Sequence, residues 1–165
     1  MGSVVHEASG LEKATWTDAD FAAMGWHDCH VHAVSVGERD DGAIPPGRLL
    51  LDLDYIVKWV DPAYGQQHFS FWIAPATLVF EGAWDITGDL GPLGELLEIA
   101  DLHRLDSPDK YPDPLWDIEG HNFELRLRAP AYTQYLRTPP RHTDHQALTL
   151  TDRGGINFTE ESFTP

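Results

Sequence analysis

Hydrophobic and polar residues alternate between positions 49 and 59, where the sequence reads LLLDLDYIVKW. The odd-numbered positions are all apolar or aromatic, and Asp52, Asp54 and Lys58 occupy three of the even-numbered positions between them. Successive side chains of a β-strand point to opposite faces of the sheet. This stretch therefore predicts a strand with one buried face and one face in solvent.

Other stretches share this period of two or are rich in aromatic and β-branched residues, which favours strands. They lie at residues 27–36, 69–80, 95–105, 122–128 and 146–150. At 95–105 the apolar residues fit neither the strand period nor the helix period cleanly, so a helix is the alternative there. Pro75 interrupts the stretch 69–80. Because proline cannot donate a hydrogen bond to a neighbouring strand, we expect two short strands or one bent strand there. The segments between the strands, which include 37–47 and the proline-rich 107–115, predict turns and loops.

One short helix precedes the strands. Thr17 is a typical N-cap residue, and the acidic residues Asp18 and Asp20 follow it in the first turn. Gly25 is a natural C-terminal stop. Many short strands after a single helix predict a mainly β (α+β) fold, an antiparallel sandwich or open barrel, rather than alternating βαβ units.

The chain has 165 residues, which is the usual length of a single domain. We expect that domain to occupy residues 15–150. The segments 1–14 and 151–165 show no clear hydrophobic period, so we expect a flexible arm and a flexible tail. Six tryptophans, five tyrosines and seven phenylalanines can supply most of a core, although aromatic residues on a surface would also suit a binding module.

The charge of the chain is strongly negative. Asp and Glu number 27 against 11 Lys and Arg, a formal net charge of −16. Such a charge repels phosphate backbones and anionic lipid surfaces, so we expect neither nucleic acid nor membrane as a partner. It suits a basic protein partner or divalent cations, and it is also typical of an ordinary solvated surface.

Cys29 is the single cysteine and cannot form an internal disulfide. The first residues have neither the basic region nor the apolar region of a signal peptide, which favours a cytoplasmic location. On a strand, the Cys29 side chain would point away from its neighbours Asp28 and His30, and we interpret it as a buried, inert thiol rather than a nucleophile.

Histidine and acidic residues gather in the first predicted strand. Asp28, His30 and His32 are two positions apart, so a strand would direct them to one face with about 7 Å between successive Cα atoms. Imidazole and carboxylate groups bind divalent metal ions such as Zn, Fe, Ni or Mn. Asp52 and Asp54 would approach these histidines if the next strand pairs with the first.

The remaining ligands of such a site stay open, and His121, His142 and His145 are further candidates. Histidines on a half-exposed strand are also commonly polar surface residues or hydrogen-bonded neighbours of the core. A role in proton transfer or at an interface is a third interpretation, because histidine changes charge near neutral pH.

Two metalloenzyme families share the His-x-His pattern. The sequence DCHVH at 28–32 resembles the first-strand metal motif of amidohydrolases, but those enzymes are (β/α)8 barrels of about 250 residues, which this chain is too short to form. Residues 25–42 hold a glycine, the His-x-His pair, a glutamate and a second glycine, an order similar to the first motif of the all-β cupins. The spacings differ from the cupin pattern, and the second cupin motif is absent.

Three further motifs resemble those of a family of uncharacterised small bacterial domains. They are Trp26-His27-Asp28, Asp54-Tyr55-Ile56 with Trp59 after it, and Ala74-Pro75-Ala76-Thr77-Leu78. A His-Asp pair ahead of the first long strand is also loosely similar to immunity-type domains, which neutralise bacterial toxins. The resemblance implies a binding domain of immunity or regulatory type that acts through protein–protein contact. The alternative is a small metal-dependent, cupin-like enzyme in which His30 and His32 hold a metal that activates water.

Overall fold

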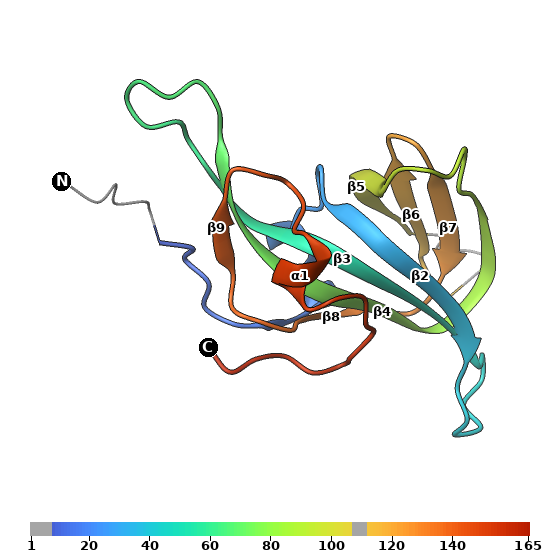
Figure 1. The fold of residues 1–165 in the computed structure, drawn as a ribbon. Helices are drawn as coiled ribbons and strands as arrows, with labels where there is room; N and C mark the ends of the chain where they lie inside the picture. Colours follow the sequence, from blue (N-terminus) through green and yellow to red (C-terminus); the bar gives the residue numbers. More distant parts are fainter. Residues whose placement is uncertain (1–7, 107–111) are drawn as a thin grey trace.

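The computed structural model describes residues 8–106 and 112–165, and these ranges hold nine β-strands and two short helices (Figure 1). The strands are β1 (Thr15–Thr17), β2 (His30–Glu38), β3 (Gly47–Val60), β4 (Ser70–Asp89), β5 (Leu97–Leu105), β6 (Leu115–Gly120), β7 (Glu124–Arg128), β8 (Thr133–Leu136) and β9 (Arg141–Thr143). The helices are the 3₁₀ helix η1 (Asp18–Ala23) and the single turn α1 (Leu150–Arg153). The predicted mainly β, antiparallel class is confirmed.

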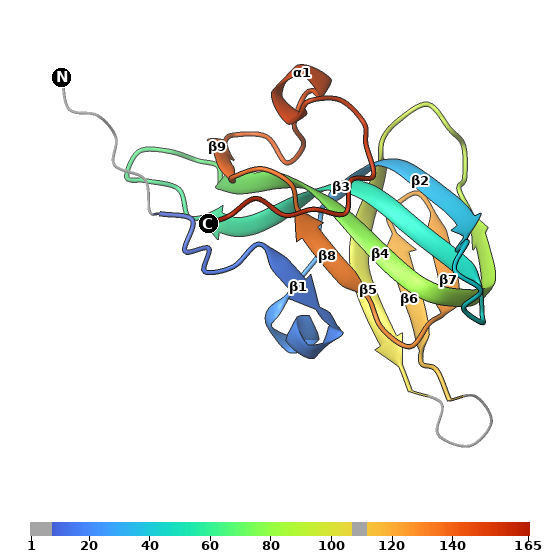
Figure 2. The same ribbon diagram turned by 90° about the horizontal axis from the view of Figure 1, so that it is seen from below.

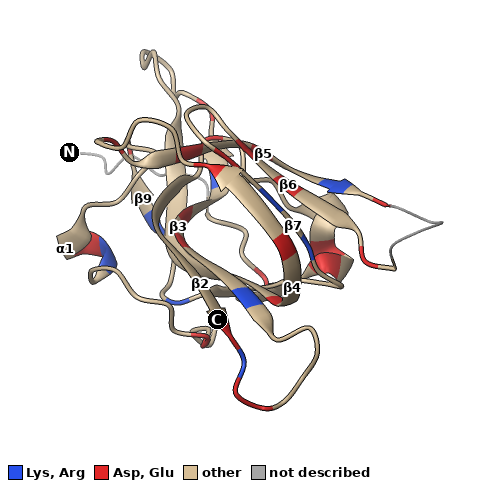
Figure 3. Cartoon of the chain, turned by 90° about the vertical axis from the view of Figure 1, so that its right-hand side faces the viewer, with Lys and Arg blue, Asp and Glu red and all other residues tan. Residues whose placement is uncertain are grey.

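Six of the strands are joined edge to edge into a ring. β4 pairs with β3, β3 with β2, β2 with β5, β5 with β6 and β6 with β7, and β7 returns to the second half of β4. All of these pairs are antiparallel, and the ring of strands is visible in Figure 3. The join between β2 and β5 is short, with His30 and Val31 opposite Glu98 and Leu97.

β4 is long enough to take part in two layers. Its first half pairs with β9 and β8, and its second half pairs with β7 from Trp84 onward, with a register shift between Trp84 and Thr87. Pro75 lies between the residues that pair with β9 and those that pair with β8. Because Pro75 faces neither β8 nor β9 directly, its lack of an N–H removes no hydrogen bond to those strands. Its carbonyl accepts a hydrogen bond from the Arg137 N–H at 2.9 Å. The expected alternative of one bent strand is what forms.

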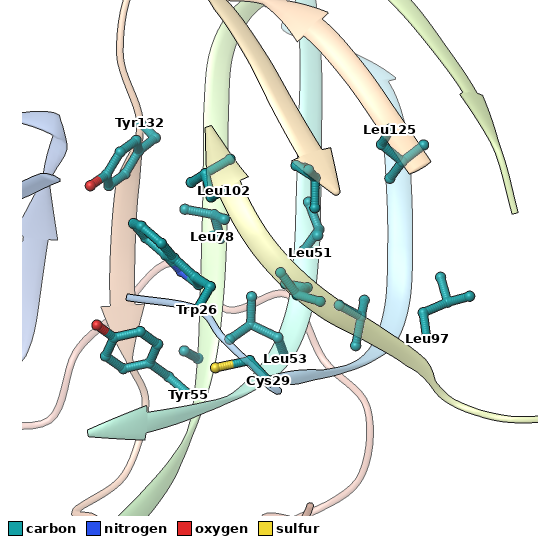
Figure 4. Packing of buried hydrophobic residues seen from close by; sticks show 14 of the residues in the cluster. Trp26, Cys29, Leu51, Leu53, Tyr55, Leu78, Leu97, Leu102, Leu125 and Tyr132 are labelled. Atoms are coloured by element: carbon teal, nitrogen blue, oxygen red, sulfur yellow. The ribbon is translucent and has the colours of Figure 1, made fainter. Parts of the chain in front are cut away.

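The interior of the barrel is filled with large apolar side chains. The odd-numbered residues of β3 from Leu49 to Tyr55 point inward, and Leu49, Leu51 and Leu53 are completely buried. A register shift between Ile56 and Lys58 ends this alternation, and Trp59 is exposed. Figure 4 shows Trp26 lying between Tyr55 and Tyr132 in this core. The alternation of the sequence therefore identified the inward face of β3 from Leu49 to Tyr55, but it is wrong at Trp59.

The N-terminal helix begins where the sequence predicts. The Thr17 side chain accepts a bond from the Ala19 N–H, and the Asp20 side chain accepts one from the Thr17 N–H at 3.0 Å, which completes a capping box. The helix is of the 3₁₀ type and ends at Ala23, before Gly25.

One predicted strand is wrong, four short strands were not predicted, and one predicted loop lies partly outside the described ranges. Residues 146–150 form no strand; the chain there is irregular and leads into α1. The short strands β1, β6, β8 and β9 were not predicted, because they have six residues or fewer and weak alternation. The loop predicted at 107–115 includes 107–111, which lie outside the described residues.

Both segments that flank the predicted domain lie against the sheet where they are described. Ala14 is buried, and its carbonyl accepts bonds from the Leu136 N–H and from Ser162 Oγ. Figure 2 shows α1 and the chain after it on the outer side of β3, away from β5 and β6. Residues 151–165, which we expected to form a flexible tail, thus cover one face of the barrel. Neither helix in the described ranges has the length or apolar character to span a bilayer.

Candidate functional site

The five predicted metal ligands do not meet at one point. His32, Asp52 and Asp54 lie together on the outer face of β2 and β3, whereas Asp28 and His30 lie beside β5. The separation of His30 from His32 arises within β2. The pairing of β2 with β3 shifts register between Val31 and Ala33, so a bulge at His32 breaks the repeat of two that would have placed both imidazoles side by side.

Asp28 also departs from the prediction, because it precedes β2 instead of belonging to it. Its backbone has a φ of 63°, in the left-handed region, within the turn that leads from Trp26 into β2. The Asp28 N–H bonds the Ile99 carbonyl on β5, and the Ile99 N–H bonds the Cys29 carbonyl, both at 2.8 Å. These bonds tie the turn to β5 and direct the Asp28 side chain away from His32.

The first group forms a buried ion cluster of His32, Asp52, Asp54, Arg137 and Arg153. Asp52 accepts bonds from Arg153 Nη2 at 2.6 Å and from Arg137 Nη2 at 2.8 Å. Asp54 accepts bonds from His32 Nε2 at 2.8 Å and from Arg153 Nε at 3.0 Å. Backbone N–H groups of the C-terminal segment, from residues 148 and 157, complete the shell.

The prediction that the polar face of β3 is exposed to solvent is therefore wrong at Asp52 and Asp54. Asp52 and Asp54 are both 0% exposed, because the C-terminal segment covers them and places Arg153 over both carboxylates. Burial by itself would raise the pKa of Asp54, but the bonds from His32 and the Leu148 N–H, with the charge of Arg153, lower it overall. Burial disfavours the charged form of Arg153. The hydrogen bonds and negative charges of Asp52 and Asp54 favour that form more strongly, so the pKa of Arg153 is raised.

The buried ion cluster is a structural feature rather than a metal site. Two carboxylates face two guanidinium groups, and each carboxylate oxygen already accepts at least one hydrogen bond. An added cation would have to displace Arg153, which is fully buried in the cluster. The cluster holds the C-terminal segment on the barrel.

The second group is a carboxylate–imidazole cluster of Asp28, Glu98 and His121. One ligand atom from each residue lies within 4.8 Å of the other two. His121 Nε2 donates to Asp28 Oδ1 at 3.1 Å and lies 3.8 Å from Glu98 Oε1. The three side chains are between 18% and 47% exposed, so the cluster is open to solvent on one side.

Three more polar side chains surround this cluster. His27 Nε2 lies 3.5 Å from Asp28 Oδ2, and His30 Nε2 lies 3.7 Å from Glu98 Oε2. Gln146, from the loop before α1, donates to Asp28 Oδ2 at 3.1 Å. Three histidines and two carboxylates from distant parts of the sequence thus meet at this end of β5.

A row of aromatic rings leads away from the carboxylate–imidazole cluster. The imidazole of His27 stacks on Trp59 with 6.0 Å between ring centroids, and Trp59 meets Phe69 and Phe71 edge to face at 5.8 and 5.0 Å. We call His27, Trp59, Phe69 and Phe71 the ring row. Trp59 is 37% exposed and Phe69 is 45% exposed, so the row is open to solvent over part of its length.

The ring row borders a shallow cleft of about 410 Å³. Its lining comes from the end of β3, the start of β4 and the loop after β9, and comprises Trp59, His68, Phe69, Phe71, Asp144, His145 and Gln146. Gln146 belongs to both features, because it lines the cleft and bonds Asp28. The cleft and the carboxylate–imidazole cluster are therefore neighbours.

Cys29 has the inert character that its position on the chain suggested. The side chain is completely buried, and burial raises the pKa of its thiol to about 12. Figure 4 shows it directed into the packed interior near Leu53 and Tyr55. A thiol that stays protonated in the core is not a nucleophile.

Some residues of these features were missed from the sequence. Glu98 and Gln146 carry no local signal, because they reach Asp28 only through the pairing of β5 with β2 and the return of the chain after β9. For Arg153 there was a signal. Two aspartates on an otherwise apolar strand need cations if that strand is covered, and the chain has only 11 Lys and Arg to provide them.

The fold and these features define a small antiparallel β-barrel with a filled interior and a polar, aromatic site beside one end of β3. Comparisons of this chain with protein families, with curated protein sequences and with solved structures found no match. The resemblances to small bacterial domains, immunity-type domains and cupins stay predictions.

Proposed function

We propose that this protein is a binding domain of immunity or regulatory type, and that it docks a basic segment of a partner protein on the ring row. The observation that supports the proposal is the partly exposed indole of Trp59 beside the carboxylate of Asp144. Trp59 is 37% exposed, and Asp144 lines the same cleft. A lysine or arginine side chain gains from both, because the face of an indole attracts cations and a carboxylate pairs with them.

The charge of the whole chain supports the same kind of partner. At a net charge of −16, the protein attracts a basic surface within about one Debye length, which is about 30 Å at 0.01 M salt, and this attraction speeds the encounter. Figure 3 shows Asp and Glu residues on several strands and connecting segments of the barrel. A general attraction of this kind brings a partner close, and the ring row supplies the specific contact.

Binding of defined cationic probes tests this proposal. Titration calorimetry with decalysine and deca-arginine at 150 mM salt should show one site per chain, and decaglutamate should not bind. Trp59→Leu should weaken the affinity at least fivefold, which corresponds to about 1 kcal/mol, the scale of an exposed cation–π contact.

Leu93→Ala is the matched control, because Leu93 is a large exposed residue at 73% and lies in the loop between β4 and β5, outside the cleft. It should leave the affinity unchanged. Equal affinities of the wild type and Trp59→Leu would mean that net charge alone attracts the probes, and the proposal would fail.

A small metal-dependent enzyme is the second candidate, and the convergence of Asp28, Glu98 and His121 favours it. A metal ion with an open position activates water for hydrolysis. Hydrolysis of p-nitrophenyl esters or phosphates that requires added metal, and that His30→Ala abolishes without unfolding the chain, would establish this candidate in place of simple binding.

A further inference from the structure

We infer that Asp28, Glu98 and His121 bind a divalent transition-metal ion such as Zn²⁺. This is not the site that the sequence suggested, because His32, Asp52 and Asp54 already bond to one another and to Arg153 in the buried ion cluster. The new set shares Asp28 with the predicted one, and its other two ligands come from β5 and from the turn between β6 and β7.

The distances in the cluster suit an ion after a small adjustment. The ligand atoms lie within 4.8 Å of one another, and His121 Nε2 is 3.1 Å from Asp28 Oδ1. In a tetrahedral zinc site with bonds near 2.0 Å, ligand atoms are about 3.3 Å apart. Rotation of the Glu98 side chain, which is 33% exposed, can close the remaining gap of at most about 1.5 Å.

The backbone holds the three ligands in a fixed relation. The His121 N–H bonds the Glu98 carbonyl at 2.9 Å, and the Glu98 N–H bonds the side chain of Asn122 at 3.1 Å. Asp28 is fixed by its own bond to the Ile99 carbonyl, one residue along β5. A site whose ligands are positioned before the ion arrives loses less entropy on binding.

His27 places a further nitrogen donor at the edge of the cluster. Its Nδ1 lies 3.0 Å from the Ala100 carbonyl oxygen, which can only accept, so Nδ1 carries the proton of this bond. Its Nε2 faces the cluster and lies 3.5 Å from Asp28 Oδ2. Metal-bound histidines show the same pattern, with the other ring N–H donated to a carbonyl.

The donor chemistry selects the class of ion. One imidazole and two carboxylates, with His27 and His30 as further nitrogen donors within reach, suit Zn²⁺, Ni²⁺ or Co²⁺. Mg²⁺ prefers oxygen ligands with strict octahedral geometry and retains its water. The inference does not depend on the proposed partner, because neither Glu98 nor His121 belongs to the ring row.

Titration calorimetry of the untagged protein with ZnCl2 tests this site. We expect one zinc ion per chain, no displacement by a tenfold excess of Mg²⁺, and a change in the visible absorption of Co²⁺ when it binds in place of zinc. His121→Ala and Glu98→Gln should each weaken zinc binding at least tenfold, with circular dichroism confirming that both variants fold.

His103→Ala is the matched control. His103 Nε2 lies 2.6 Å from Glu119 Oε2, so this is another partly exposed His–carboxylate pair, but one outside the cluster. Its loss should leave zinc binding unchanged. Three results would overturn the inference: no zinc bound by the wild type, unchanged binding in both His121→Ala and Glu98→Gln, or an equal loss in His103→Ala.

Discussion

Arg153 neutralises two carboxylates that have no contact with solvent. Its side chain is fully buried and bonds both Asp52 and Asp54. Replacing Arg153 with alanine leaves two buried negative charges with reduced compensation, so we expect a loss of about 3–5 kcal/mol in the free energy of unfolding. Urea denaturation followed by tryptophan fluorescence measures this loss.

Arg141→Ala is the control for that prediction. Arg141 pairs with Asp152 at 2.8 Å, but both side chains are about half exposed, at 51% and 47%. An exposed pair contributes less than about 1 kcal/mol. Similar losses in the two variants would show that the Arg153 contacts do not have the stabilising role of a buried pair.

The depressed pKa of Asp54 gives a prediction for the dependence of stability on pH. A carboxyl group whose pKa is lower in the folded state stabilises the fold above its unfolded pKa, which is about 3.9 for aspartate. That contribution is lost as the pH falls through the folded pKa. The stability difference between the wild type and Asp54→Asn should be largest near pH 7 and shrink below about pH 4. Urea denaturation across this range tests it, and a constant difference would contradict it.

At the scale of elements, β3 and β4 approach closely at Gly47. A Cβ atom on Gly47 would lie 2.1 Å from the backbone oxygen of Ala83, a contact that no rotamer change can relieve. We expect Gly47→Ala to lower the free energy of unfolding by at least about 1–3 kcal/mol, because the strands must separate. Denaturant unfolding measures this change.

Gly37, at the end of β2, offers a matched control. A Cβ there has nothing within 4 Å, and its backbone is outside the left-handed region. Gly37→Ala should change stability by no more than about 0.5 kcal/mol. A Gly47→Ala variant as stable as Gly37→Ala would mean that the two strands are not packed as closely as described.

At the scale of elements, sequence patterns predicted some features of the strands and missed others. The alternation identified the inward face of β3 from Leu49 to Tyr55, because side chains inside the barrel must be apolar. It did not predict the register shift that leaves Trp59 exposed. It could not identify what covers the outward face. Asp52 and Asp54 look like solvent-facing residues until Arg153, about 100 positions later, is placed over them. Likewise the bulge at His32 depends on pairing with β3, so the separation of His30 from His32 has no local signal.

At the scale of the whole molecule, the negative charge predicts a dependence on salt. With 27 acidic and 11 basic residues, the association rate with a basic partner or probe should fall steeply as salt rises from 50 to 300 mM, because screening shortens the range of attraction. Stopped-flow fluorescence with decalysine measures this rate. The dissociation rate, which reports the local contact with Trp59, should change much less. A salt effect confined to dissociation would contradict this division of roles.

In the proposed function, the ring row and its cleft form the binding face of the barrel. Nuclear magnetic resonance of the ¹⁵N-labelled protein, titrated with decalysine, tests whether the probe binds there. We predict shifts of the Trp59 indole N–H and of the amides of residues 143–147, with the buried indoles of Trp26 and Trp116 unmoved. Shifts that instead concentrate on acidic loops away from the cleft, such as residues 38–41, would contradict the claim.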